Sequence, residues 1–225
     1  MTRPACAVLI LHGGRAASRA PTAPAQLTVL RMIPFERAVR RATRGSDVVV
    51  SRPRFRLRGW NGAEASPVAD LRAAVEGLGV PTVLIGHSMG ARAALRMAGH
   101  PLVAAVAALA PWLPAGEPVG RLAGGRVLLA HGDRDTVTDP AGTWAYAERA
   151  RGAAVRVPAP GEADGADAVA AVEVAGDGHA MLRRAGLWHR LAVEFALLSL
   201  DRPAEAGPVA NAFRRAAAGL PRLVV

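Results

Sequence analysis

The sequence contains no lysine, a single cysteine, few aromatic residues and no long apolar run. Because Cys6 stands alone, no internal disulfide can form, which excludes a disulfide-stabilised secreted domain. Gly, Pro or Arg interrupts each apolar stretch before it reaches the roughly 20 residues that a membrane-spanning helix needs. The amino terminus also lacks the small-residue cleavage pattern of a signal peptide. We therefore expect a cytoplasmic protein without a membrane partner.

The absence of lysine means that the formal net charge of +10 comes entirely from arginine. The arginines are scattered over predicted helices and loops and form no basic tail. A positive field can favour anionic substrates or salt-sensitive contacts with nucleic acid. No recognisable nucleic-acid-binding motif accompanies the charge, so we expect solvated arginines and no nucleic-acid partner.

The apolar residues that are present fall into short runs that predict β-strands. Several runs are apolar on both faces, as in parallel strands covered by helices on each side. The segments between them mix apolar and charged residues at helical spacing and stop near glycine. This alternation predicts an α/β fold with a doubly wound, mainly parallel sheet of about six strands. The predicted strands are residues 7–11, 47–51, 82–86, 103–110, 126–130 and 168–174. The predicted helices are residues 27–44, 67–78, 89–99, 140–151 and, as a closing amphipathic helix, 182–198.

Two segments do not fit the alternation. Residues 157–167 are rich in Pro, Gly, Ala and Asp, which predicts a loop before the last strand. We expect residues 1–200 to form the domain and residues 201–225 to form a peripheral tail with a short helix at 211–218.

The most informative motif is Gly86-His87-Ser88-Met89-Gly90, which follows an apolar strand and precedes a helix-forming stretch. This context is typical of a nucleophile elbow, in which a serine occupies a sharp turn from strand to helix. Gly86 and Gly90 supply the space that close packing requires. The N–H groups at the start of the helix can stabilise negative charge beside Ser88. The motif therefore predicts Ser88 as a nucleophile.

With this motif, the sequence over roughly residues 5–200 resembles the α/β-hydrolase family, particularly its compact esterase, thioesterase and dienelactone-hydrolase-like members. The family order of nucleophile, acid and base implies Ser88, then Asp135, then His179. Asp135 ends the pattern His131-Gly132-Asp133-Arg134-Asp135, and His179 follows the last predicted strand. Asp139 and Asp177 remain alternatives for the acid. The other histidines considered for the base are His87, His100, His131 and His189.

The resemblance also implies an oxyanion hole, because His12-Gly13-Gly14 follows the first strand where the family places its other donor. We expect the N–H groups of Gly14 and Met89 to be the donors, with Gly13 or Arg15 as alternatives to Gly14. Only residues 111–125 separate the fourth and fifth predicted strands, which leaves no room for a cap domain. The predicted substrate pocket is lined by Gly13, His87, Trp60 and Trp112.

No metal or cofactor site is predicted. The six histidines are spread along the chain, and neither an H-E-x-x-H motif nor a phosphate-binding glycine loop is present. The prediction is a serine hydrolase that cleaves a small-molecule carboxylic ester or thioester through an acyl-serine intermediate. Two alternatives stay open: a non-catalytic protein of the same fold that binds a ligand or partner, and an acyltransferase or perhydrolase that uses the same residues.

Overall fold

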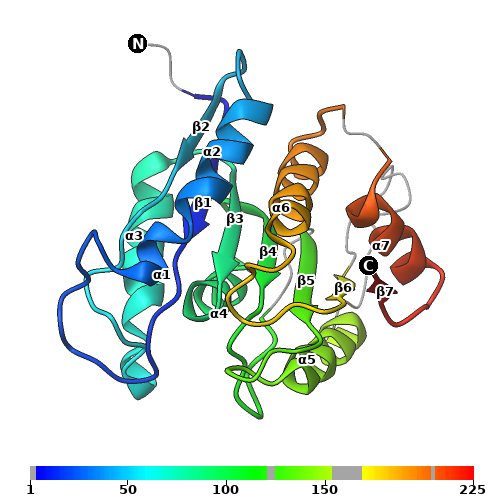
Figure 1. The fold of residues 1–225 in the computed structure, drawn as a ribbon. Coiled ribbons are helices and arrows are strands. Elements are labelled where there is room, and N and C mark those ends of the chain that lie inside the picture. Colours follow the sequence, from blue (N-terminus) through cyan, green and yellow to red (C-terminus); the bar gives the residue numbers. More distant parts are fainter. Residues whose placement is uncertain (1–3, 121–124, 154–168, 204–205) are drawn as a thin grey trace.

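A parallel sheet runs through the centre of the computed structural model, which describes residues 4–120, 125–153, 169–203 and 206–225 (Figure 1). Its order is β2-β1-β3-β4-β5-β6-β7, and every neighbouring pair is parallel. The strands are β1 (Cys6–Leu11), β2 (Val48–Ser51), β3 (Thr82–His87), β4 (Val103–Leu109), β5 (Arg126–Gly132), β6 (Val169–Val174) and β7 (Leu223–Val224). The loop predicted at residues 157–167 lies outside the described residues.

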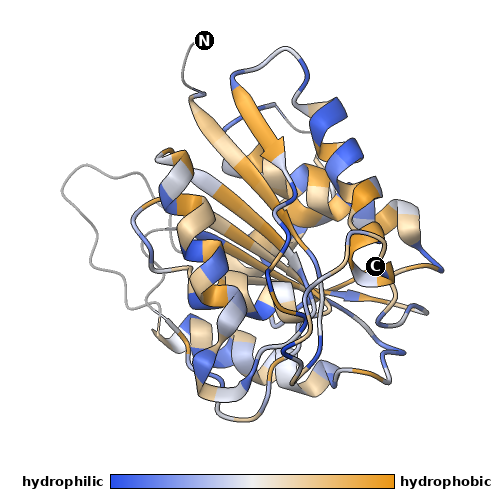
Figure 2. Ribbon diagram, turned by 90° about the vertical axis from the view of Figure 1, so that its left-hand side faces the viewer, coloured by the Kyte–Doolittle hydropathy of each residue, from blue (hydrophilic) through white to orange (hydrophobic). Residues whose placement is uncertain are grey.

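Helices cover both faces of the sheet because the central strands are apolar on both sides. The helices are α1 (Leu27–Leu30), α2 (Ile33–Ala42), α3 (Ser66–Leu78), α4 (Met89–Arg96), α5 (Pro140–Ala153), α6 (Ala185–Ser199) and α7 (Pro208–Ala217), with a 3₁₀ turn at Gly62–Glu64. Along β1, Val8 and Ile10 join the core under α2, α6 and α7, whereas Leu9 and Leu11 join the core under α3, α4 and α5. Figure 2 shows the strands mainly in the colours of hydrophobic residues, with helices of mixed colour around them. The predicted doubly wound α/β fold is confirmed.

The single helix predicted over residues 27–44 is wrong, because the segment forms two helices. Pro34 lies in the first turn of α2. Proline has no N–H to donate to the carbonyl four residues earlier, here that of Leu30, and its ring clashes with that carbonyl, so it begins a helix more readily than it continues one. α1 therefore ends at Leu30, and Arg31 caps it.

The carboxyl-terminal segment differs from the peripheral tail expected for residues 201–225. α7 packs against β6, and Val209 is completely buried in the core. β7 adds a seventh strand beside β6, and the N–H of Val225 donates to the carbonyl of Glu173 at 2.9 Å. This segment closes one edge of the sheet.

The strand order has a switch point between β1 and β3. From β1 the chain moves outward to β2 and then crosses back to β3 on the other side of β1. The loops that follow β1 and β3 therefore diverge and leave a crevice at the carboxyl ends of the strands, where open α/β sheets bind ligands. The loops after β5 and β6 end at the same edge. No helix in the described ranges is both long and apolar enough to cross a membrane.

The burial of Val209 predicts that the carboxyl-terminal segment unfolds together with the sheet. The Val209→Ala substitution should lower the free energy of unfolding by about 1–3 kcal/mol, because it removes buried methyl groups. Leu220→Ala, at a side chain that is 43% exposed, is the matched control and should change it little. Urea unfolding followed by circular dichroism measures both. An unchanged stability in Val209→Ala would mean that α7 is not part of the cooperative unit.

Candidate active site

Ser88 occupies a strained turn between β3 and α4. Its backbone has φ 55° and ψ −117°, a region that residues with side chains rarely adopt. The turn is tight because β3 and α4 touch: a Cβ on Gly86 would lie 2.5 Å from the carbonyl carbon of Gly90. A Cβ on Gly90 would lie 2.5 Å from the carbonyl oxygen of His12. Strain of this kind persists only where surrounding packing enforces it, and it clusters at functional sites.

The structure brings the three residues of the predicted triad together from three loops at the carboxyl edge of the sheet. His179 Nε2 lies 3.1 Å from Ser88 Oγ. On the other side of the ring, His179 Nδ1 lies 2.8 Å from Asp135 Oδ2. A continuous hydrogen-bonded chain therefore runs from a serine hydroxyl through an imidazole to a carboxylate.

The carboxylate of Asp135 is held by several donors at once. Oδ1 accepts the N–H groups of Val137 and Thr138 at 2.8 and 2.9 Å. Oδ2 lies 3.0 Å from His131 Nε2 and accepts the Thr138 hydroxyl at 2.9 Å. Burial alone would raise the pKa of Asp135, but the hydrogen bonds from His131, His179 and the two N–H groups outweigh it and hold the pKa well below its usual range. The carboxylate therefore stays ionised.

Thr138 was not identified from the sequence, although it contacts both Asp135 and His179. Its hydroxyl lies 3.0 Å from His179 Nδ1 as well as within hydrogen-bonding distance of Asp135. Its position three residues after an aspartate is the only signal in the sequence. Such spacing is common in turns and does not by itself indicate a functional residue.

Two further histidines support the site without contacting Ser88 Oγ. His131 Nδ1 is 2.7 Å from the hydroxyl of Thr143, so the ring ties Asp135 to α5. His87 Nε2 is 2.9 Å from the carbonyl oxygen of His179. Burial, together with electrostatic repulsion from the neighbouring His179 and Arg31 side chains, lowers the pKa of His87 to about 3. His87 is therefore neutral, and its N–H positions the main chain of the His179 loop.

The loop after β1 is fixed by its own histidine. His12 Nε2 accepts the N–H of Phe55 at 3.1 Å, which leaves Nδ1 protonated to donate to the carbonyl of Gly13 at 2.7 Å. Burial lowers the pKa of His12 and keeps the ring neutral. The N–H of Arg15 donates to the Arg58 carbonyl at 2.8 Å, so Arg15 is not free to act as an oxyanion donor. The N–H groups of Gly13 and Gly14 donate to no described residue.

A cleft of about 650 Å³ opens above Ser88. Gly13, Gly14, His87, Ser88 and His179 line it, and of these the sequence predicts Gly13 and His87 as pocket residues. The other residues that line the cleft were not predicted as pocket residues from the sequence. The remaining lining residues are Leu27, Thr28, Arg31, Arg134, Thr136, Val137, Asp177, Gly178, Ala180, Leu182 and Arg183. Leu182 was expected on the buried stripe of the closing helix, but it precedes α6 and is exposed.

Trp60 and Trp112 do not line this cleft, contrary to the prediction. The two rings pack edge to face, with centroids 6.3 Å apart. The guanidinium carbon of Arg92 lies 3.9 Å from the centre of the Trp60 ring and 4.6 Å from that of Trp112. Arg92 in turn pairs with the buried carboxylate of Glu117 at 2.6 Å. The aromatic residues therefore enclose a buried ion pair against α4 instead of facing a substrate.

The alternative acid and base residues have other partners. Asp177 accepts the indole N–H of Trp188 at 2.9 Å and braces the loop before α6. Asp139 accepts the N–H of Ala141 at the start of α5. His189 packs edge to face on Phe35, and His100 lies 3.5 Å from Glu76. Among the residues that the structure describes, no group of three or more His, Cys, Asp or Glu side chains is arranged to hold a metal ion.

The similarity to known proteins extends over most of the chain. Residues 8–225 match the model of the alpha/beta hydrolase family. No curated protein sequence matches the chain.

Several solved structures share the fold. A lidless α/β serine hydrolase from Xanthomonas campestris has a TM-score of 0.58 at 20% sequence identity, covering 92% of this chain and 86% of that one. Est1E from Butyrivibrio proteoclasticus has a TM-score of 0.59 at 14% identity, with coverage of 89% and 90%. An α/β serine hydrolase homologue from Coxiella burnetii has a TM-score of 0.56 at 20% identity, with coverage of 85% and 88%. At these identities, the solved structures show a shared fold. Because the family model matches residues 8–225, the chain belongs to the alpha/beta hydrolase family.

Proposed function

We propose that the protein is a serine hydrolase that cleaves a carboxylic ester or thioester through an acyl-Ser88 intermediate. The observation that carries the proposal is the hydrogen-bonded chain from Ser88 Oγ through His179 to Asp135. A neutral serine hydroxyl is a poor nucleophile and needs an adjacent base. The family match supports hydrolysis, and the strained backbone of Ser88 is consistent with a residue held for reaction.

In the first half of the reaction, Ser88 Oγ attacks the acyl carbon while His179 Nε2 takes the hydroxyl proton. The tetrahedral intermediate then collapses: the bond to the leaving group breaks, and His179 returns the proton to the departing alcohol or thiol. In the second half, His179 accepts a proton from water, the resulting hydroxide equivalent attacks the acyl-serine carbon, and Ser88 leaves with the proton. The products are a carboxylic acid and the alcohol or thiol.

Asp135 supports both halves by fixing the ring of His179. Because its carboxylate accepts from Nδ1, the neutral ring presents an unprotonated Nε2 to Ser88. The same ionised carboxylate stabilises the positive charge that His179 gains when it takes the proton. Hydrogen bonds from two main-chain N–H groups hold the carboxylate in place while His179 is protonated and deprotonated.

We assign the oxyanion hole to the N–H groups of Gly14 and Met89, with Gly13 as the alternative to Gly14. Met89 is the first residue of α4, so its N–H has no partner within the helix. The side chain of Met89 also packs where a Cβ of Gly14 would lie, which keeps the two loops close together. A pair of N–H donors of this kind would stabilise the negative oxygen of the tetrahedral intermediate.

The Ser88→Ala variant tests the nucleophile. It should lose labelling by a fluorophosphonate probe, and kcat for p-nitrophenyl esters should fall by roughly 10⁴-fold or more, as when the nucleophile of other serine hydrolases is removed. Ser46→Ala is the matched control and should label and turn over like the wild type, because the Ser46 hydroxyl donates to the Thr43 carbonyl just before β2, at the opposite end of the sheet from Ser88.

Labelling that survives in Ser88→Ala would contradict the assignment of the nucleophile. A folded wild-type protein that neither labels nor hydrolyses any ester, from acetyl to dodecanoyl, would favour a non-catalytic binding protein of the same fold.

The low pKa of Asp135 predicts a pH-dependent contribution to stability. In the unfolded chain an aspartate titrates near pH 4, and in the folded chain Asp135 titrates lower. Its stabilising effect is therefore complete above about pH 4 and is lost as the pH falls below that value. The gap in unfolding free energy between wild type and Asp135→Asn should be large at pH 7 and shrink towards pH 3, because the unfolded wild-type chain binds a proton at Asp135 in this range while the folded chain does not. Urea unfolding across this pH range measures it.

Asp139→Asn, at an exposed carboxylate, is the control and should show a much smaller change with pH. A gap for Asp135→Asn that stays constant from pH 7 to pH 3 would show that Asp135 is not the strongly ionised group that the mechanism needs.

A further inference from the structure

Three arginines line the cleft above Ser88, and none of them has an anionic partner among the residues that the structure describes. The side chains of Arg31, Arg134 and Arg183 form no ion pair or hydrogen bond with any described residue. The one acidic residue in the lining is Asp177. Its carboxylate is already taken up by the N–H of Arg184 and the indole N–H of Trp188. The cleft therefore carries uncompensated positive charge beside the proposed nucleophile.

Arg31 is the most confined of the three. It is half-buried, whereas Arg134 and Arg183 are exposed. Burial lowers the pKa of Arg31, and no carboxylate offsets that effect. Its charge also reaches the site, since it contributes to lowering the pKa of His87. A cation that has lost part of its water without gaining a partner is destabilised, and an anion bound in the cleft would relieve this cost.

Exposed apolar side chains surround the same opening. Leu27, Val137 and Leu182 are 77%, 71% and 66% exposed, the highest values among the large apolar side chains of the described residues. All three line the cleft above Ser88. Scattered exposed leucines need no explanation, but three at the mouth of one cleft form a patch that favours contact with an apolar ligand.

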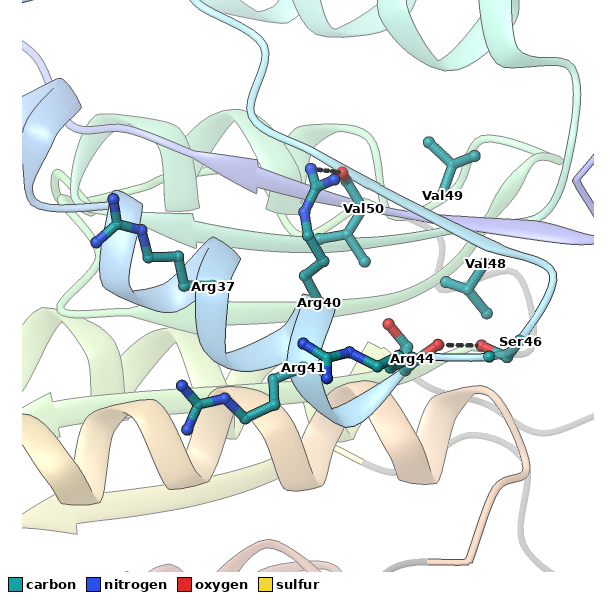
Figure 3. A pocket seen from close by; sticks show the side chains of 10 residues that line it. Arg37, Arg40, Arg41, Arg44, Ser46, Val48, Val49 and Val50 are labelled. Carbon is teal, nitrogen blue, oxygen red and sulfur yellow. Dashed lines mark hydrogen bonds between the residues drawn. The ribbon is translucent and has the colours of Figure 1, made fainter.

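A second group of arginines lines a different cavity, so the number of arginines alone does not identify a binding site. Arg37, Arg40, Arg41 and Arg44 line another cavity, of about 560 Å³, between α2 and β2 (Figure 3). Arg40 donates to the carbonyl of Val50 at 2.7 Å and pairs with Glu36. This cavity lies beside the start of β2, at the opposite end of the sheet from Ser88. Arg41 there makes no ion pair with a described residue and provides a matched control for Arg31.

We propose that Arg31 determines substrate specificity by binding a negatively charged group of the ester or thioester, while Leu27, Val137 and Leu182 contact its apolar part. The substrate class is thus an amphipathic acyl compound that carries a carboxylate or phosphate. This inference rests on the proposed function. The anionic group belongs either to the acyl part or to the leaving group, and two pairs of substrates distinguish these cases.

The first pair places the charge in the acyl part: the p-nitrophenyl monoester of glutaric acid and its neutral methyl ester. The second pair places it in the leaving group: butyryl-coenzyme A and the neutral thioester of butyrate with N-acetylcysteamine. Arg31→Gln should lower kcat/KM for the anionic member of at least one pair by about tenfold or more, as expected for the loss of a charge-assisted hydrogen bond. The neutral members should change less than about twofold, and Arg41→Gln should leave all four values unchanged.

Equal losses for anionic and neutral substrates in Arg31→Gln would overturn the proposal, as would a wild type that prefers the neutral member of both pairs. A wild type that hydrolyses none of the four would count against the proposed function rather than against the anion site.

A binding measurement tests the anion site without relying on hydrolysis. Ser88→Ala protein should bind 4-phenylbutyrate more tightly than the neutral 4-phenylbutanamide in calorimetry. The added Arg31→Gln substitution should abolish this difference, whereas added Arg41→Gln should preserve it. Equal affinity for the acid and the amide in Ser88→Ala would overturn the proposal.

Discussion

The close packing of β3 against α4 is the constraint on which the rest of the site depends. Gly86 and Gly90 meet with no room for a side chain on either residue, and the chain must reverse direction between them. Ser88 lies at this turn, and its positive φ costs about 1–3 kcal/mol. The almost complete burial of β3 and α4 outweighs that cost. The turn lies beside the crevice that the strand order opens between β1 and β3.

The loops around this turn are held by neutral histidines and one carboxylate. His12 fixes the loop after β1, and His87 holds the main chain at His179. Burial keeps both rings uncharged. Asp135 is the ionised group, with donors on both oxygens. A fixed negative charge therefore lies behind His179, and Arg31 adds a positive charge without an ion-pair partner among the described residues to the lining of the cleft.

Much of this arrangement could be predicted from the sequence because it depends on local pattern. Continuous apolar runs predicted the buried parallel strands, and Gly86-His87-Ser88-Met89-Gly90 predicted the turn. Other features depend on contacts between distant segments. β7 is defined by main-chain pairing with β6. With only two residues, it is too short to show the alternation of apolar and polar residues that predicts a strand. Trp60 and Trp112 were misassigned because the packing of Arg92 against both rings cannot be inferred from spacing. Arg31 could not be distinguished among so many arginines until its burial and lack of a partner were known.

The central claim is that Ser88 becomes acylated during turnover, and intact-protein mass spectrometry of a rapidly quenched reaction tests it most directly. The wild type mixed with p-nitrophenyl butyrate should gain the mass of one butyryl group within the first turnover. Peptide fragmentation should place that group on Ser88. Ester hydrolysis without any covalent adduct, or an adduct on a different residue, would contradict the account.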